Sequence, residues 1–250
     1  SKVEDALAAF SEGLALTGDD LRGLKGRGEA LVKLNRPEEA RKDFLAAVAL
    51  DPRNTEARLA LASARARSGD PAGALAEIEK VWAIIPSLPG KSRQAQIEAV
   101  LEVAEADKAT EALLAFIDRD DRGDLSAAQI DDFLSGAARV MDARKAPAQA
   151  VLLLDRLLLR HPRDPQLRYW RAQRLLETAA FAAAEEDCRA LMGLGLPPNA
   201  QPAVHFLRAR ALLGMKRPAE ARDSLDACER LLPALDPRSA AARDLSALRS

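Results

Sequence analysis

An alanine that recurs at nearly constant spacing constrains the fold of this chain most strongly. It follows a polar helix start at Ala6, Ala40, Ala74, Ala112, Ala150, Ala184 and Ala221. The steps between neighbouring alanines are 34, 34, 38, 38, 34 and 37 residues. Four residues after each alanine stands an aliphatic residue, a phenylalanine or a cysteine, which in an α-helix lies over the same face. This self-similarity predicts a stack of repeated units.

Prolines and small residues define the helices of each unit. A proline stands three residues before four of the alanines, in the first helical turn, where its missing N–H is not needed. A second set of amphipathic segments carries a small residue at a fixed place: Gly28, Ala62, Ala138, Ala172 and Ala209. The chain is rich in Ala, Leu and Arg and only 4% aromatic, which favours helices over strands. We predict an all-α chain of fourteen helices: a leading helix over residues 2–16, six pairs, and a closing helix over residues 237–249.

A unit with a small residue at place 8, alanine at place 20 and a large residue at place 24 resembles the tetratricopeptide repeat. The segment LKGRGEALVKLNRPEEARKDFLAAVALDP carries most of this pattern, and the resemblance covers nearly the whole chain. The unit from Lys91 to Asp118 departs most, because Val100 stands where a small residue is expected. The resemblance implies a right-handed α-solenoid of tetratricopeptide helix pairs. We expect one continuous solenoid with an N-terminal part, residues 1–125, and a C-terminal part, residues 126–250.

The leading helix has the pattern of a second helix of a pair, with no first helix before it. A repeat of this kind cannot bury its apolar face alone. We therefore expect either that the chain is a piece of a longer array or that another element covers this end.

The resemblance also implies that the first helix of each pair lines a concave groove. The candidate partner-binding residues there are Lys25, Arg139, Tyr169, Trp170, Gln173, Phe206 and Arg210. Aromatic residues and arginine are enriched where protein interfaces gain most of their binding energy. The alternative is that Trp170 and Phe206 pack between helix pairs as core residues. Trp82 stands on a second helix, where we expect it to pack.

Charge is unevenly distributed, although the net charge is only −1. From Glu98 to Asp132 there are eleven acids and three bases, and from Arg139 to Arg174 nine bases and three acids. These stretches suit the steering of a charged partner, or self-association, although a solvated surface explains most charge runs. The near-neutral total argues against a nucleic-acid partner.

The stretch DRDDRGDLSAAQ resembles an EF-hand calcium loop, with Asp118 and Asp120 at ligand places and Asp124 as a further acid. Arg122 and Gln129 occupy two other ligand places and remove an oxygen ligand and a bidentate carboxylate. We therefore expect a loop that caps the next helix, with no metal and no cofactor. Cys188 and Cys228 lack metal-binding spacing, so we expect buried apolar residues or a disulfide.

The motifs of known catalytic sites are absent, and the two histidines, His161 and His205, lie in different units. The stretch GLGLPP, residues 193–198, is interpreted as a helix terminator. No apolar run is long enough for a membrane span. We predict a non-catalytic protein–protein interaction scaffold that binds a partner peptide or domain in its groove.

An alternative is a bacterial envelope tetratricopeptide array involved in exopolysaccharide export or assembly. The Ala/Arg-rich composition, which resembles that of high-GC bacteria, favours it by association only. A bacterial periplasm is slightly favoured over the cytoplasm, and the sequence leaves the compartment open.

Overall fold

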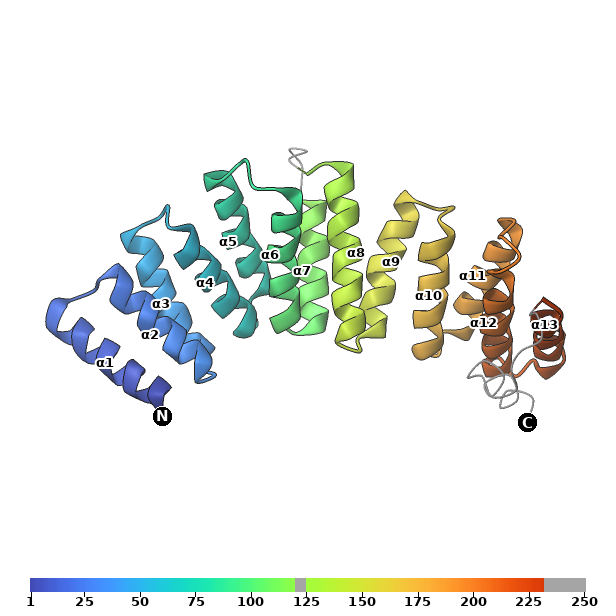
Figure 1. The fold of residues 1–250 in the computed structure, drawn as a ribbon, viewed down its shortest axis with the longest axis horizontal. Coiled ribbons are helices and arrows are strands. Elements are labelled where there is room, and N and C mark those ends of the chain that lie inside the picture. Colours follow the sequence, from blue (N-terminus) through green and yellow to red (C-terminus); the bar gives the residue numbers. More distant parts are fainter. Residues whose placement is uncertain (120–124, 232–250) are drawn as a thin grey trace. The chain divides into compact units, whose positions relative to one another are not determined.

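The computed structural model describes residues 1–119 and 125–231. These residues form thirteen α-helices and no strand (Figure 1). The helices are α1 (Lys2–Thr17), α2 (Leu21–Lys33), α3 (Pro37–Leu50), α4 (Thr55–Arg67), α5 (Pro71–Ile84), α6 (Gly90–Val103), α7 (Ala106–Asp118), α8 (Ala127–Ala143), α9 (Pro147–Arg160), α10 (Pro165–Glu177), α11 (Phe181–Gly193), α12 (Gln201–Gly214) and α13 (Pro218–Leu231). The all-α fold and the order of a leading helix followed by six pairs are confirmed. The predicted closing helix lies outside the described residues.

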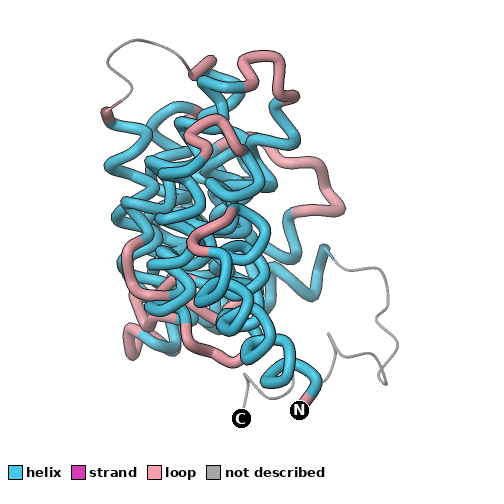
Figure 2. Tube along the Cα trace, turned by 90° about the vertical axis from the view of Figure 1, so that its left-hand side faces the viewer, coloured by secondary structure: helices cyan, strands magenta, loops and turns pink. Residues whose placement is uncertain are grey.

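The helices belong to two compact units, residues 1–144 and 145–250. Within each unit, helices adjacent in the chain pack against each other, and first helices of consecutive pairs also touch, as α4 does with α6 and α10 with α12. Short loops join the helices (Figure 2). The division at residue 125 stays a prediction.

Helix boundaries follow from capping side chains and from one recurring turn. Asp20, Asn54 and Asp164 accept hydrogen bonds from the first backbone N–H groups of α2, α4 and α10, which have no partner within the helix. Five of the six turns from a first to a second helix contain a residue in the left-handed region, and the turn from α6 to α7 does not: these residues are Asn35, Gly69, Lys145, Ala179 and Lys216, with φ near 56°, 84°, 56°, 58° and 59°. This repeated turn reverses the chain after α2, α4, α8, α10 and α12.

In pairs such as α2/α3 and α10/α11 the core lies between the two helices, where place 8 faces place 24. Gly28 and Phe44 form one such contact: a Cβ at Gly28 would lie 2.7 Å from the Phe44 ring. Where the facing residue is smaller, alanine replaces glycine. Ala172 packs with Cys188 and Ala209 with Leu225 in the same apolar clusters. The size of one residue is therefore matched to that of the other.

The third pair, α6 and α7, departs from this arrangement. It combines Val100 at place 8 with Phe116 at place 24, and the two helices touch each other far less than the partners of α2/α3 or α4/α5. Helix α7 packs mainly on α5, and α6 on α8. Trp82 of α5 is 7% exposed and lies 5.9 Å from Phe116 and 5.8 Å from Phe133, centroid to centroid. The prediction that Trp82 packs in the core is confirmed.

Helix α1 leaves part of its apolar face open. Phe10 is 37% exposed, whereas Phe44, at the same place of α3, is 1% exposed. Leu14 of α1 is buried against α2 and the residues around Leu24. The expectation that a further element covers this face stays a prediction.

Candidate functional site

A pocket of about 480 Å³ lies between two consecutive first helices of the second unit. Its walls come from the N-terminal halves of α10 and α12, the end of α11 and the linker from α11 to α12. The lining residues are Pro165, Gln166, Tyr169, Leu191, Leu196, Pro197, Ala200, Ala203 and Val204. Most of these side chains are apolar, so the pocket suits an apolar group.

The pocket depends on an unusually long linker. Residues 194–200 separate α11 from α12, whereas only residues 161–164 separate α9 from α10. The extra length forms a turn in which Gly195 has φ near 67° and the Ala200 N–H donates to the Pro197 carbonyl at 2.9 Å. The Gln201 side chain donates to the Leu196 carbonyl at 2.9 Å and holds the turn against α12. The linker thus supplies one wall of the pocket.

This wall was missed at the level of sequence. The stretch GLGLPP was interpreted as a helix terminator, and it does follow the end of α11 at Gly193. The signal was the 37-residue step from Ala184 to Ala221, three residues longer than the regular step. The sequence therefore indicates where the extra residues lie along the chain, but only the structure shows that they pack beside α10.

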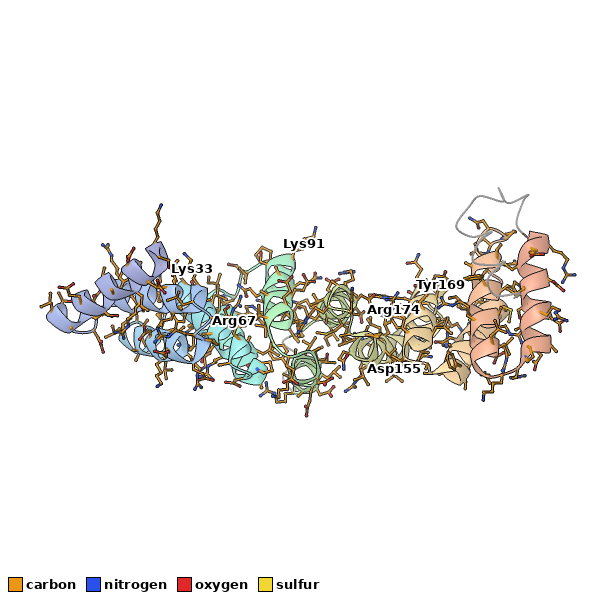
Figure 3. The ribbon with its side chains drawn as sticks, turned by 90° about the horizontal axis from the view of Figure 1, so that it is seen from below. Lys33, Arg67, Lys91, Asp155, Tyr169 and Arg174 are labelled. Atoms are coloured by element: carbon orange, nitrogen blue, oxygen red, sulfur yellow. The ribbon has the colours of Figure 1, made fainter. Side chains whose placement is uncertain are left out.

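Tyr169 and Gln166 are the polar side chains of the pocket. Tyr169 is half-buried, and this burial raises the pKa of its phenol, while a hydrogen bond with the Gln173 side chain acts in the opposite direction. The phenol is therefore neutral at physiological pH, and it can donate or accept a hydrogen bond. Tyr169 and Asp155 lie on opposite sides of this unit (Figure 3).

The structure places the other predicted groove residues in different surroundings. Trp170 is partly buried on α10 and does not line the pocket. Phe206 packs against Ala209, Leu225 and Cys228, in agreement with the alternative prediction that it is a core residue. Arg210 is exposed on α12.

The remaining two predicted residues belong to the first unit. Lys25 of α2 is ion-paired with Glu56 of α4, and Arg139 is exposed on α8. The structure thus brings Tyr169 and Gln173 together, whereas Lys25 and Arg139 belong to the unit that lacks this pocket.

Some arginines of the basic stretch from Arg139 to Arg174 form ion pairs with a buried acid. Asp187 is 0% exposed and accepts hydrogen bonds from Arg168 Nη1 at 3.1 Å and from Arg171 Nε and Nη2 at 2.8 and 2.6 Å. Arg171 also donates to Asp155 at 2.6 Å. The hydrogen bonds that Arg171 donates to Asp187 raise the pKa of Arg171. The excess of bases between Arg139 and Arg174 is therefore partly neutralised by an acid of α11, and self-association through it stays a prediction.

The two cysteines are free and buried in different apolar clusters. Burial raises the pKa of the Cys188 thiol to about 12. The prediction of buried apolar residues is confirmed, and the alternative of a disulfide is not realised.

In the calcium-loop look-alike, Asp118 ends α7, while Asp120 and Asp124 lie outside the described residues. Ser126 caps α8 in a reciprocal pair with Gln129, with hydrogen bonds of 3.2 and 2.9 Å, as the capping interpretation predicts.

Within residues 1–119 and 125–231, no three His, Cys, Asp or Glu side chains gather as a metal site would need. In the same residues, no helix has the length and apolar character to cross a membrane.

The helix pairs, with a small residue facing a large one, agree with the family comparison. Residues 1–52 and 25–89 match the model of the tetratricopeptide repeat. Residues 1–89 of this chain therefore carry tetratricopeptide repeats. Beyond residue 89 the described residues continue as further α-helices, α6 to α13. Tetratricopeptide repeats generally mediate protein–protein interactions.

Solved structures with some similarity to this chain include three proteins. YrrB, a "TPR protein with an unusual peptide-binding site", is 14% identical, with 91% of this chain and 94% of that chain covered and a TM-score of 0.39. A tetratricopeptide repeat protein from Parabacteroides merdae is 15% identical, with 99% and 78% covered and a TM-score of 0.40. The TPR2AB domain of yeast Sti1, in complex with a pHSP90, is 18% identical, with 99% and 90% covered and a TM-score of 0.40. No curated protein matches the chain by sequence.

Proposed function

We propose that this tetratricopeptide chain is a non-catalytic scaffold that binds a peptide segment of a partner protein, with the pocket between α10 and α12 as the anchor point. The observation that carries the proposal is the apolar pocket of about 480 Å³ on two consecutive first helices. Its size lies within the range of small-molecule sites, so it accommodates a large apolar side chain. Burial of such a side chain contributes about 1.5–3 kcal/mol to binding.

The chemistry of the lining supports a protein partner. Leu191, Leu196 and Val204 offer apolar contacts, and Tyr169 and Gln166 offer hydrogen bonds. An apolar centre with a few polar groups is the usual composition of an interface core. Tyrosine also gives a large contact area at little cost in conformational entropy.

The alternative of an exopolysaccharide array has less support. A groove that guides sugars needs several exposed aromatic rings, and Trp82 is buried in the core. Tyr169 is the aromatic residue among the pocket-lining residues that the structure describes. The periplasm as the compartment stays a prediction.

The test fills the pocket and asks whether peptide binding is lost. The immobilised chain is exposed to a displayed library of short random peptides, in wild-type form and as Ala203→Trp. Ala203 lines the pocket and is exposed, so an indole there occupies the space without entering the core. Ala182→Trp, at an exposed position of α11 outside the pocket lining, is the matched control.

We expect enrichment of related peptides on the wild type and on Ala182→Trp, and loss of these peptides on Ala203→Trp. No enrichment on the wild type, or equal enrichment on Ala203→Trp, would contradict the proposed function.

A further inference from the structure

The pocket accepts an uncharged side chain. Among the described residues that line it, none is charged, and Leu191, Leu196 and Val204 contribute hydrocarbon. A charged group would lose its hydration there without gaining a partner, which is costly. The anchor of a bound peptide is therefore an aliphatic or aromatic side chain.

A cation lies on the same helix face, two turns from the pocket. Ala203 lines the pocket and Arg210 follows it by seven residues, so both project from one side of α12. Their Cα atoms are about 10 Å apart, at about 1.5 Å of rise per residue. Arg210 is exposed, so a bound peptide can reach its guanidinium group.

The groove face of α10 does not oppose this positive charge. At the places that correspond to Ala203, Phe206 and Arg210, α10 carries the uncharged residues Gln166, Tyr169 and Gln173. Glu177, at the end of α10, is ion-paired with Arg174 at 3.2 Å. The exposed positive charge of Arg210 at this end of the groove therefore favours an acidic partner.

Two further basic residues of α12, Arg208 and His205, do not add to the positive charge of Arg210. The Arg208 side chain donates to Glu185 at 3.0 Å and is neutralised there. Burial, together with the charges of Arg208 and Arg230, lowers the pKa of His205, so this side chain is neutral at pH 7. Arg210 is thus the group of α12 that is placed to bind an anion from a peptide.

We infer that the groove selects peptides in which an apolar anchor is separated by about three residues from an acidic residue, whose carboxylate binds Arg210. The spacing follows from the distance of about 10 Å and an extended chain that advances about 3.3 Å per residue. The arginine side chain is long and flexible, so spacings of about two to four residues are compatible. This inference rests on the proposed peptide-binding function and specifies its ligand.

The test reverses the charge without touching the pocket. The same displayed library of short random peptides is selected on the wild type, on Arg210→Glu and on Arg222→Glu. Arg222 is exposed on α13 and outside the pocket lining, so it controls for the general effect of one charge reversal. We expect acidic residues at the stated spacing on the wild type and on Arg222→Glu. On Arg210→Glu the apolar anchor persists and lysine or arginine replaces the acid.

Affinity gives a second readout. A fluorescent peptide with the sequence enriched on the wild type is titrated, and its anisotropy is followed. Arg210→Glu weakens its binding by about tenfold or more, because an attractive pair becomes a repulsive one. High salt weakens binding to the wild type and has a smaller effect on Arg210→Glu, since salt screens an exposed charge pair.

The outcomes separate this inference from the function on which it rests. Enriched peptides with an apolar anchor and no acidic preference, or an unchanged acidic preference on Arg210→Glu, overturn the inference and leave the pocket as a binding site. Failure of the wild type to enrich any peptide removes the proposed function and the inference together.

Discussion

Single acidic residues in the interior connect the helices of this protein. Asp187 is fully buried and binds two arginines of α10, and Asp43, which is 6% exposed, binds Arg27 through two bonds of 2.8 and 2.7 Å. A buried ion pair contributes little net stability relative to a pair of apolar residues of similar volume, because both charges lose their hydration on folding. Removal of one partner is different, since it leaves an uncompensated charge in the interior.

The substitution Asp187→Asn is therefore expected to lower the free energy of unfolding by about 3 kcal/mol, since Arg168 and Arg171 lose their common anion. Urea denaturation followed by circular dichroism measures the change. Asp155→Asn is the control: Asp155 also pairs with Arg171, but its side chain is 46% exposed, and we expect a loss below about 1 kcal/mol. Equal losses for the two variants would show that the burial of Asp187 does not determine its contribution.

Within a helix pair, the size of the residue at place 8 of the first helix is matched to the size of the residue that faces it on the second helix. In α2 and α3 the large Phe44 ring requires glycine at position 28, because a Cβ would lie 2.7 Å from the ring. In α10 and α11 the smaller Cys188 coexists with Ala172. In α6 and α7 neither residue of the pair is small, and the two helices separate.

The matching predicts a compensating pair of substitutions. Gly28→Ala gains about 1 kcal/mol of helix propensity but overpacks the contact with Phe44, which costs about 1–3 kcal/mol. We expect net destabilisation in the wild-type background. In the Phe44→Leu background, Gly28→Ala is neutral or stabilising, because the aromatic ring that would clash with the new Cβ is absent. A double-mutant cycle from urea denaturation should give a coupling energy of about 1–2 kcal/mol, and a value near zero would argue against the size matching.

Across the molecule, acids with a lowered pKa occur in both units. Burial alone raises the pKa of Glu77, but hydrogen bonds from Lys80 and Arg58 outweigh it, so the pKa lies below its ordinary value. In the second unit, Glu185 has a lowered pKa for the same reasons, through Arg208 and Arg189. A carboxyl whose folded pKa is lowered stabilises the fold above its unfolded pKa, and this contribution is lost as the pH falls.

We therefore expect the thermal unfolding temperature to be nearly constant around neutral pH and to fall below about pH 4.5, near the ordinary pKa of glutamate. Glu77→Gln should lower this temperature at neutral pH and make it less dependent on pH. Glu111→Gln, at an exposed position of α7, is the control and should follow the wild type. Differential scanning calorimetry from neutral to acidic pH measures both effects, and parallel curves for Glu77→Gln and the wild type would refute the role of Glu77.

Part of the candidate site was predictable. The resemblance placed Tyr169, Gln173 and Arg210 on first helices, and the structure puts Tyr169 in the pocket with Gln173 bonded to it. Phe206 turned out to pack on α13 residues, and the linker wall at Leu196 and Pro197 was missed. A helix face can be assigned from spacing alone, whereas the neighbour that covers it depends on the packing of another helix.

The sequence by itself determined the succession of helices, because period, caps and prolines are local signals. It also placed several of the recurring alanines in the core: Ala40, Ala74 and Ala150 are each 0% exposed. Only the tertiary structure decided that α6 and α7 separate, that Asp187 neutralises two arginines, and that a longer linker forms a pocket. Each of these features depends on the distance between side chains of different helices, and the packing of the whole unit sets that distance.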